Sequence, residues 1–279
     1  MSNITYDILD ESFFTKSQYE YHLHLLLADD ASTYLIYDED QLLAYRSFQL
    51  EDQNRELFSW KDELQALIHQ DKMLQLSFKT VKISLLHQAF TFVPTELYES
   101  HNEANYLQKI SANASNEIAC RDDLKFLSIK NIYTLKIDLQ RFIKETFPNA
   151  IISHSVSSLI DRLYPYVAND NLKKKIFLNF HNKQVQVILF EGQNLLFANN
   201  FQFQTGNDAA YYLMLVINQF KLNPEVVEVC MSGQIEKDTE VYNTIFRYIR
   251  NLTFLDYTIE KEKKRAFTSV ENHLFLSII

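Results

Sequence analysis

Two stretches of the chain repeat one pattern, and this repeat is the strongest constraint on the fold. Residues 21–50 and residues 175–203 each contain three consecutive segments with strand character, followed by a stretch of helical periodicity. In the first stretch, apolar and polar residues alternate over residues 19–28, as in a half-buried strand. In the second stretch, tight connections separate the strands and mark hairpins. These strands are predicted at residues 176–180, 184–190 and 194–203. The repeat predicts two domains of similar architecture.

The order of the predicted elements indicates an α/β fold. In the second half, the three strands are followed by helix, strand, helix and strand, which gives the order βββαβαβ. Three antiparallel strands followed by helix-linked strands are typical of the ribonuclease-H-like arrangement, and two such βββαβα domains make an actin-like ATPase fold. The turn-forming run Asn-Asp-Asn at residues 169–171 is the best candidate for a boundary or hinge. We therefore predict an N-terminal domain over residues 1–168 and a C-terminal domain over residues 169–279.

The scarcity of glycine limits the chemistry that such a fold can perform. The chain has 279 residues and three glycines, which are Gly192, Gly206 and Gly233. Loops that cradle phosphates need glycine, because the backbone must approach the phosphate closely and often adopts a positive φ. A β-carbon at a left-handed position costs roughly 1–2 kcal/mol per residue. The composition therefore argues against nucleotide hydrolysis.

Charge and composition also exclude several classes of partner. The formal net charge of −9 is unfavourable for binding nucleic acid or an anionic membrane surface. The sequence has no run of about 18 uncharged apolar residues, so no membrane insertion is expected. The first residues lack the apolar core of a secretory signal. Cys120 and Cys230 lie far apart in the sequence, which argues against a disulfide framework and favours a reducing cytoplasm.

Three segments of the chain resemble a known family. They are residues 89–98, which read Ala-Phe-Thr-Phe-Val-Pro-Thr-Glu-Leu-Tyr, residues 177–202 and residues 208–220. They are similar to a family of uncharacterised bacterial proteins, found largely in Bacteroidetes, with an actin-like ATPase fold. The run that ends in Phe-Val-Pro also resembles pilus-assembly members of the actin-like superfamily, which assist type IV pili as scaffolds. The resemblance covers almost all of the chain. It implies a fold more than a function, because no activity is established for the family.

The resemblance implies where a nucleotide would lie. Actin-like ATPases place an acidic residue and glycines at the first hairpin of each half, beside the β- and γ-phosphates. Here the first hairpin offers Asp29 or Asp30 as the magnesium-side acid, and Ser32 or Thr33 as a phosphate contact. The second hairpin, residues 179–184, has neither an acid nor a glycine. The resemblance thus predicts a phosphate site that is only half present.

Two glycines occupy further positions of the implied nucleotide cleft. Gly233 stands where a glycine pair would lie against adenosine, and Gly206 stands at a helix start that is usually glycine-rich. We interpret the chain as a non-catalytic actin-like scaffold or protein-interaction module with degenerate nucleotide-binding loops. A protein partner would bind in the interdomain cleft or at an exposed sheet edge. The alternative is an ATP-binding protein, or an ATPase- or kinase-like enzyme, that uses this cleft with ATP and Mg²⁺. No catalytic residue and no cofactor are assigned.

Two other groups of residues are candidate sites. His22 and His24 lie on one face of the first predicted strand, as a His-x-His metal pair would. The simpler interpretation is that both face solvent, opposite the apolar side of the strand. The adjacent acids Asp122 and Asp123 would point to opposite faces of a strand, which makes them a poor pair for acid–base catalysis. We therefore assign no metal site.

Overall fold

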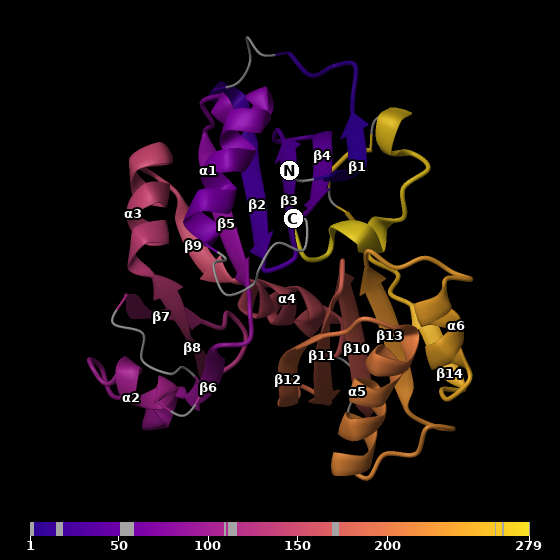
Figure 1. The fold of residues 1–279 in the computed structure, drawn as a ribbon. Helices are drawn as coiled ribbons and strands as arrows, with labels where there is room; N and C mark the ends of the chain where they lie inside the picture. Colours follow the sequence, from indigo (N-terminus) through magenta and orange to yellow (C-terminus); the bar gives the residue numbers. More distant parts are fainter. Residues whose placement is uncertain are drawn as a thin grey trace.

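The computed structural model describes residues 3–14, 19–50, 59–108, 110, 116–168, 173–259, 261–263 and 265–278. Its strands form two large sheets, one in each half of the chain, and a third, small sheet inserted in the first half (Figure 1). In Figure 1 the first large sheet lies in the upper part of the molecule, and the second lies below it on the right. The small sheet lies below the first on the left, so the two halves and the insertion surround the centre of the molecule.

The first-half sheet has the strand order β1-β4-β3-β2-β5-β9. Strands β2, β3 and β4 form the predicted antiparallel meander, and β5 and β9 continue the sheet in parallel with β2. The strands are β1 (Asn3–Leu9), β2 (His22–Ala28), β3 (Ala31–Tyr37), β4 (Leu42–Gln49), β5 (Thr80–Leu86) and β9 (Ile151–His154). The helices are α1 (Trp60–Gln70), α3 (Ile137–Thr146) and α4 (Ser155–Leu163). Helix α1 begins where the Ser59 side chain accepts a hydrogen bond from the N–H of Asp62.

The second-half sheet has the equivalent order β12-β11-β10-β13-β14. Its meander consists of β10 (Lys174–His181), β11 (Gln184–Glu191) and β12 (Asn194–Gln202), followed by α5 (Gly206–Gln219), β13 (Glu228–Gly233), α6 (Glu240–Phe246) and β14 (Asn251–Phe254). The two hairpin turns contain Asn182 and Gly192, with φ of 49° and 54°. Asparagine and glycine are the residues that tolerate this left-handed conformation best. The predicted order βββαβαβ is therefore confirmed.

The small sheet is inserted between β5 and α3. It has the order β6-β8-β7 and consists of β6 (Phe90–Pro94), β7 (Glu117–Asp123) and β8 (Ile129–Lys136), with the short helix α2 (Glu103–Leu107) beside it. The sequence pattern predicts an exposed loop over residues 112–118, of which residues 112–115 lie outside the described part of the chain, and strand character over residues 124–135. In the structure, β7 already begins at Glu117 and β8 begins only at Ile129, so both predicted boundaries are corrected.

The two terminal segments complete the first half. Near the N-terminus, residues 3–9 form strand β1, which pairs antiparallel with β4. The C-terminal residues 265–278 return from the second half to the first sheet, where Phe267 and Phe275 join a buried cluster with residues of β2, β3 and β4. The ring of Phe275 lies edge-on to that of Tyr45, and the guanidinium of the half-buried Arg162 in α4 donates to the carbonyl of Leu276 at 2.7 Å. This segment covers the sheet face that carries Tyr45.

The main hydrophobic core crosses from one half to the other. One cluster of buried side chains includes α4 residues such as Leu159 together with Phe177, Ile188 and Phe190 of β10 and β11. A second cluster lies wholly within the second half, between its sheet and helices α5 and α6. The proposed hinge at residues 169–171 lies outside the described residues, and the domain bounds remain a prediction.

Candidate functional site

The first hairpins of the two halves bind each other directly through Asp30. This residue lies in the turn between β2 and β3, and its carboxylate faces the β10–β11 hairpin. One oxygen accepts from the side-chain amide of Asn182 at 3.0 Å and from the backbone N–H of Lys183 at 2.9 Å. The other accepts from the side-chain amide of Gln184 at 2.9 Å. Both oxygens of Asp30 are therefore engaged by the second hairpin.

A second set of hydrogen bonds lies beside this contact and joins the same elements. Gln234, directly after β13, accepts from the N–H of Asn182 at 2.9 Å through its side-chain oxygen. Its amide nitrogen donates to the hydroxyls of Ser47 and Tyr45 in β4, at 3.0 and 3.1 Å. One glutamine thus connects the hairpin of the second half to the sheet of the first. Uncharged amides are well suited to this role, because each one both donates and accepts.

Next to Gln234, a buried histidine completes the contact. His181, at the end of β10, lies 2.9 Å from the hydroxyl of Thr33 through its Nε2 atom, and Thr33 lies 2.8 Å from the hydroxyl of Ser47. Burial lowers the pKa of His181 to about 4, although the nearby Asp30 carboxylate acts in the opposite direction. The imidazole is therefore neutral at physiological pH.

Because His181 is buried and neutral, we expect the folded protein to lose stability in mild acid. In the unfolded chain the pKa of histidine is about 6.5, so between pH 6.5 and 4 the unfolded state binds the proton more strongly. Neutral His181 contributes about 3 kcal/mol to the free energy of unfolding. This contribution is complete above pH 6.5 and is lost as the pH falls to about 4. Urea unfolding of wild type and His181→Gln at pH 7 and pH 4 measures this contribution. Glutamine does not titrate, so the wild type should lose about 3 kcal/mol more than the variant. Equal losses would contradict the assignment.

The other residues of the implied nucleotide cleft are distributed over three places. Ser32 is buried at the start of β3. Asp29 accepts from the indole Nε1 of Trp60 at 2.9 Å and lines a cavity of about 520 Å³ between α1 and the small sheet. Gly233, at the end of β13, lines a different, mainly apolar cavity of about 630 Å³ beneath β1 and the C-terminal segment. Gly233 lies close to the Asp30 contact, because the next residue, Gln234, binds Asn182 of the same hairpin. Asp29 instead points towards α1, where it binds Trp60.

Gly206 lies at the N-terminus of α5, where carboxylate side chains accept hydrogen bonds from the backbone N–H groups. Its own N–H donates to the carboxylate of Glu240 in α6 at 3.0 Å. The carboxylate of Asp208 accepts from the N–H groups of Gln204 and Thr205, at 3.0 and 2.9 Å, and these bonds hold the pKa of Asp208 below its usual value. An added β-carbon at Gly206 would lie 2.8 Å from the hydroxyl oxygen of Thr244, so glycine here is needed for the approach of α6. The helix start carries two carboxylates where an anion would otherwise bind.

The simpler interpretation expected His22 and His24 both to face solvent. This expectation was wrong. His24 is 1% exposed, because the C-terminal segment covers this face of the sheet. Its Nε2 lies 2.8 Å from the Ser84 hydroxyl, and burial is the main reason why its pKa is well below the usual value. His22 is half-buried, with Nδ1 2.6 Å from the Thr80 hydroxyl. Within the described part of the chain, no three His, Cys, Asp or Glu side chains are grouped as a metal site would require.

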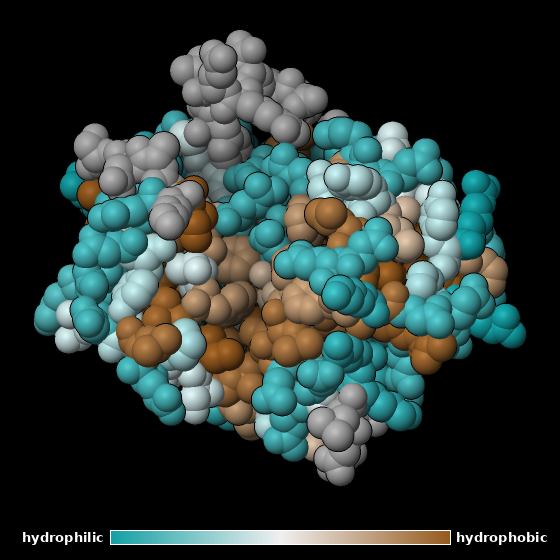
Figure 2. Space-filling model, turned by 90° about the horizontal axis from the view of Figure 1, so that it is seen from below, coloured by the Kyte–Doolittle hydropathy of each residue, from teal (hydrophilic) through white to brown (hydrophobic). Residues whose placement is uncertain are grey.

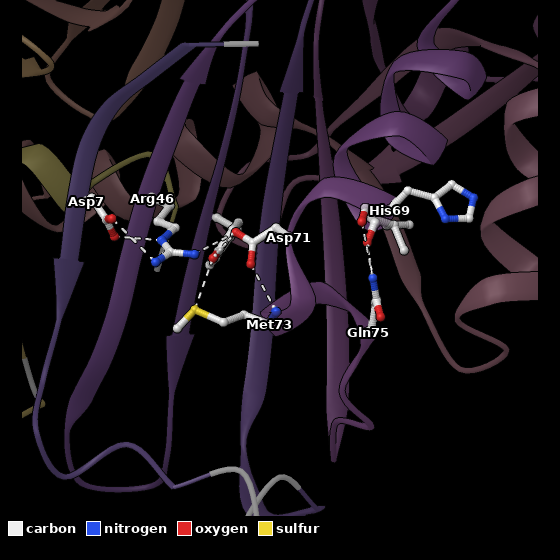
Figure 3. Close-up of polar contacts among 8 residues, drawn as sticks. Asp7, Arg46, His69, Asp71, Met73 and Gln75 are labelled. Carbon is white, nitrogen blue, oxygen red and sulfur yellow. Dashed lines mark hydrogen bonds and ion pairs between the residues drawn. The ribbon is translucent and has the colours of Figure 1, made fainter. Parts of the chain in front are cut away.

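One buried carboxylate was missed by sequence reasoning. Figure 3 shows Asp71, which follows α1, pointing towards Arg46 of β4. Its Oδ2 accepts from the Tyr34 hydroxyl at 2.6 Å and from the Arg46 guanidinium at 3.0 Å, while its Oδ1 accepts from the N–H of Met73. Arg46 also contacts Asp7 of β1. All these partners belong to the chain itself, so the network fixes α1 and β1 to the sheet.

The partners of Asp30 in the second half were missed too. The second hairpin was noted only for lacking an acid and a glycine, but its Asn182, Lys183 and Gln184 supply the donors that hold Asp30. Gln234 and His181 carried no signal of their own, because a single polar residue at a strand end fits many roles. A useful signal was the run His-Asn-Lys-Gln, which is rich in hydrogen-bond donors where a phosphate loop would have glycine.

Comparison with known proteins identifies the family. Residues 10–252 match the model of a family described as "Protein of unknown function (DUF3822)". The chain belongs to this family. No curated protein matches it. Among solved structures, a Bacteroides thetaiotaomicron protein described as having an actin-like ATPase fold and unknown function is 24% identical. Its TM-score is 0.74, and the match covers 88% of this chain and 95% of that one.

A second solved structure supports the same fold for this DUF3822 member. It is a PilM–PilN type IV pilus biogenesis complex, with 10% identity and a TM-score of 0.60. The match covers 93% of this chain and 96% of that one. At these levels of identity the likeness shows the fold alone. The expected actin-like ATPase fold, with two ribonuclease-H-like halves, is therefore confirmed.

Proposed function

We propose that this DUF3822 member is a non-catalytic actin-like scaffold or protein-interaction module whose nucleotide-binding loops are degenerate. The observation that carries the proposal is the engagement of Asp30. In an active clamp the acid of the first hairpin would face a magnesium ion and phosphates, whereas here both of its oxygens accept from Asn182, Lys183 and Gln184. A nucleotide would have to break these hydrogen bonds before it could lie between the hairpins.

Two further observations support a role without catalysis. The start of α5 carries the carboxylates of Asp208 and Glu240, which would repel a phosphate. Burial raises the pKa of the Cys120 thiol to about 11 and also raises that of Cys230. A buried thiol that stays protonated is a poor nucleophile. We therefore assign no catalytic residue.

The proposed partner is another protein, in a reducing cytoplasm. Both cysteines are free, which fits such a compartment. The net charge of −9 argues against nucleic acid. No helix in the described ranges is long and apolar enough to cross a membrane. The similar solved structure is described as a PilM–PilN type IV pilus biogenesis complex, and a complex on this fold gives the proposal a precedent.

A turnover assay tests the proposal against the alternative of an ATPase- or kinase-like enzyme. The alternative has one observation in its favour, since Gly233 lines a cavity of about 630 Å³. We expect phosphate release from Mg²⁺–ATP below about 4 × 10⁻⁴ s⁻¹, the rate of an unassisted small GTPase. Turnover well above this value, retained on purification and removed by Asp30→Asn, would establish the enzyme and reject the scaffold.

A further inference from the structure

Helix α5, which lies wholly in the described part of the chain, presents an uncharged stripe to solvent. The exposed residues that make up this stripe are Asn207, Tyr211, Leu215, Asn218 and Gln219. Tyr211 is 62% exposed and Leu215 is 45% exposed. The exposed residues of α3, by contrast, are Arg141, Lys144 and Glu145, as is usual for a helix that packs on the core through one side. An exposed face with tyrosine and without charge is typical of a surface that another protein covers.

The lack of charge extends along the sequence on both sides of the stripe. Charged residues make up 23% of the chain, but the segment 192–220 contains a single one, Asp208. In Figure 1, α5 runs along the front of the second half to its lower end. Figure 2 views the molecule from below and shows hydrophobic residues gathered over the middle of that face. Helix α5 therefore reaches a side of the molecule where much apolar surface meets solvent.

The stripe is complementary to a second copy of itself. When two α5 helices lie antiparallel about a two-fold axis at residue 213, Tyr211 of one copy lies opposite Leu215 of the other. The same axis places Asn207 of one copy opposite Gln219 of the other. The tyrosine ring covers the leucine side chain, and the two amides each donate and accept hydrogen bonds. Such a contact is isologous, and no charged side chain of the stripe loses its water.

The charges at the two ends of α5 favour the antiparallel arrangement. Asp208 lies in the first turn of the helix, and the exposed Lys221 follows its C-terminal end. The two-fold axis brings Lys221 of one copy opposite Thr205 of the other, one turn from Asp208 and within reach of a lysine side chain. A parallel pair would instead place like charges together at each end. The antiparallel contact also lets two chains with a net charge of −9 meet through uncharged surface.

We propose that the stripe of α5 is a dimerisation surface, on which a second copy of this chain packs with its own α5 antiparallel. This inference goes beyond the proposed scaffold function and does not depend on it. A pair of 14-residue helices buries less surface than most obligate dimers, so we expect a dissociation constant of about 1–100 µM. The dimer would present every other binding surface of the chain twice, which strengthens the binding of a partner with two matching sites.

Sedimentation velocity on the full chain, at concentrations from about 1 to about 200 µM, measures this dimerisation. Leu215→Glu should weaken the dimer about tenfold or more, because its carboxylate would lie against Tyr211 of the other copy without a partner. Leu97→Glu makes the same change at another exposed leucine, beside the small sheet, and should change the dissociation constant less than about twofold. Both sites are exposed, so each variant should unfold within about 2 °C of the wild type.

Cysteine cross-linking tests the antiparallel arrangement. A mixture of Tyr211→Cys and Leu215→Cys chains should form a disulfide-linked dimer with copper–phenanthroline, because these two positions face each other across the axis. Either variant alone should cross-link less, and the wild type controls for its native cysteines, Cys120 and Cys230.

Three results would overturn the dimer. They are a wild type that stays monomeric over the whole concentration range, equal effects of Leu215→Glu and Leu97→Glu, and Tyr211→Cys alone cross-linking as readily as the mixture. Each of them leaves the scaffold function standing. ATP turnover, conversely, would reject the scaffold and leave the α5 surface untouched.

Discussion

Replacing Gly233 with alanine is expected to prevent folding or to lower the free energy of unfolding by more than about 4 kcal/mol. Gly233 ends β13 with φ of 81°, a left-handed conformation that alone disfavours alanine by about 1–2 kcal/mol. An added β-carbon would also lie 2.1 Å from the carbonyl oxygen and 2.9 Å from the nitrogen of Phe180. Both are backbone atoms of β10, the central strand of the sheet, so neither can move aside. Urea unfolding followed by the fluorescence of Trp60 measures the loss.

Gly192→Ala is the matched control for this prediction. Gly192 also has a positive φ, 54°, in the turn between β11 and β12. Its replacement should cost the conformational strain of a left-handed alanine, about 1–2 kcal/mol. The difference between the two variants isolates the approach of Gly233 to Phe180. If both variants lose the same stability, the close approach is not what requires glycine at residue 233.

Replacing Asp30 with alanine is expected to lower the free energy of unfolding by about 3 kcal/mol. The change removes the acceptor for Asn182, Lys183 and Gln184 and leaves their donors unpaired at a partly buried junction. Hydrogen bonds to a charged group contribute about 1.5–3 kcal/mol, and unpaired donors add to the loss. For a chain of this size, the midpoint of thermal unfolding should fall by about 5–10 °C. Differential scanning calorimetry measures the shift.

Two further substitutions calibrate the Asp30 result. Asp40→Ala removes an exposed carboxylate from the turn between β3 and β4 and should change stability by less than about 0.5 kcal/mol. Asp30→Asn keeps one acceptor oxygen and should fall between the wild type and Asp30→Ala. The proposed junction would be refuted by an Asp30→Ala variant as stable as Asp40→Ala.

The meanders of both halves could be predicted from the sequence because their signals are local. In the second half, the turns at Asn182 and Gly192 separate strands that follow each other directly, so periodicity and turn chemistry agree. Strand β7 gave no such signal, since Glu117, Arg121 and Asp123 distribute charge along it. Its strand conformation depends on pairing with β8, including ion pairs from Lys136 to Glu117 and from Lys130 to Asp123. Partners of this kind are visible only in the folded chain.

The candidate site shows the same division between local and distant signals. The turn that contains Asp30 was recognisable, but its partners lie about 150 residues further along the chain. Likewise, the alternating pattern placed His24 opposite the apolar side of β2, whereas the C-terminal segment buries that face. Alternating hydrophobicity shows that the two faces of a strand differ. It does not show whether a distant segment of the chain covers the polar face.

Thermal unfolding with and without Mg²⁺–ATP and Mg²⁺–ADP tests the central claim most directly. A ligand at about 100 times its dissociation constant stabilises the folded state by about 2.7 kcal/mol, which would raise the midpoint by several degrees. With Asp30 held by the second hairpin, we expect a shift of less than about 1 °C at about 5 mM of either nucleotide. A magnesium-dependent rise of about 5 °C or more, reduced by Asp30→Asn, would show that the hairpins open to admit nucleotide and would contradict the account.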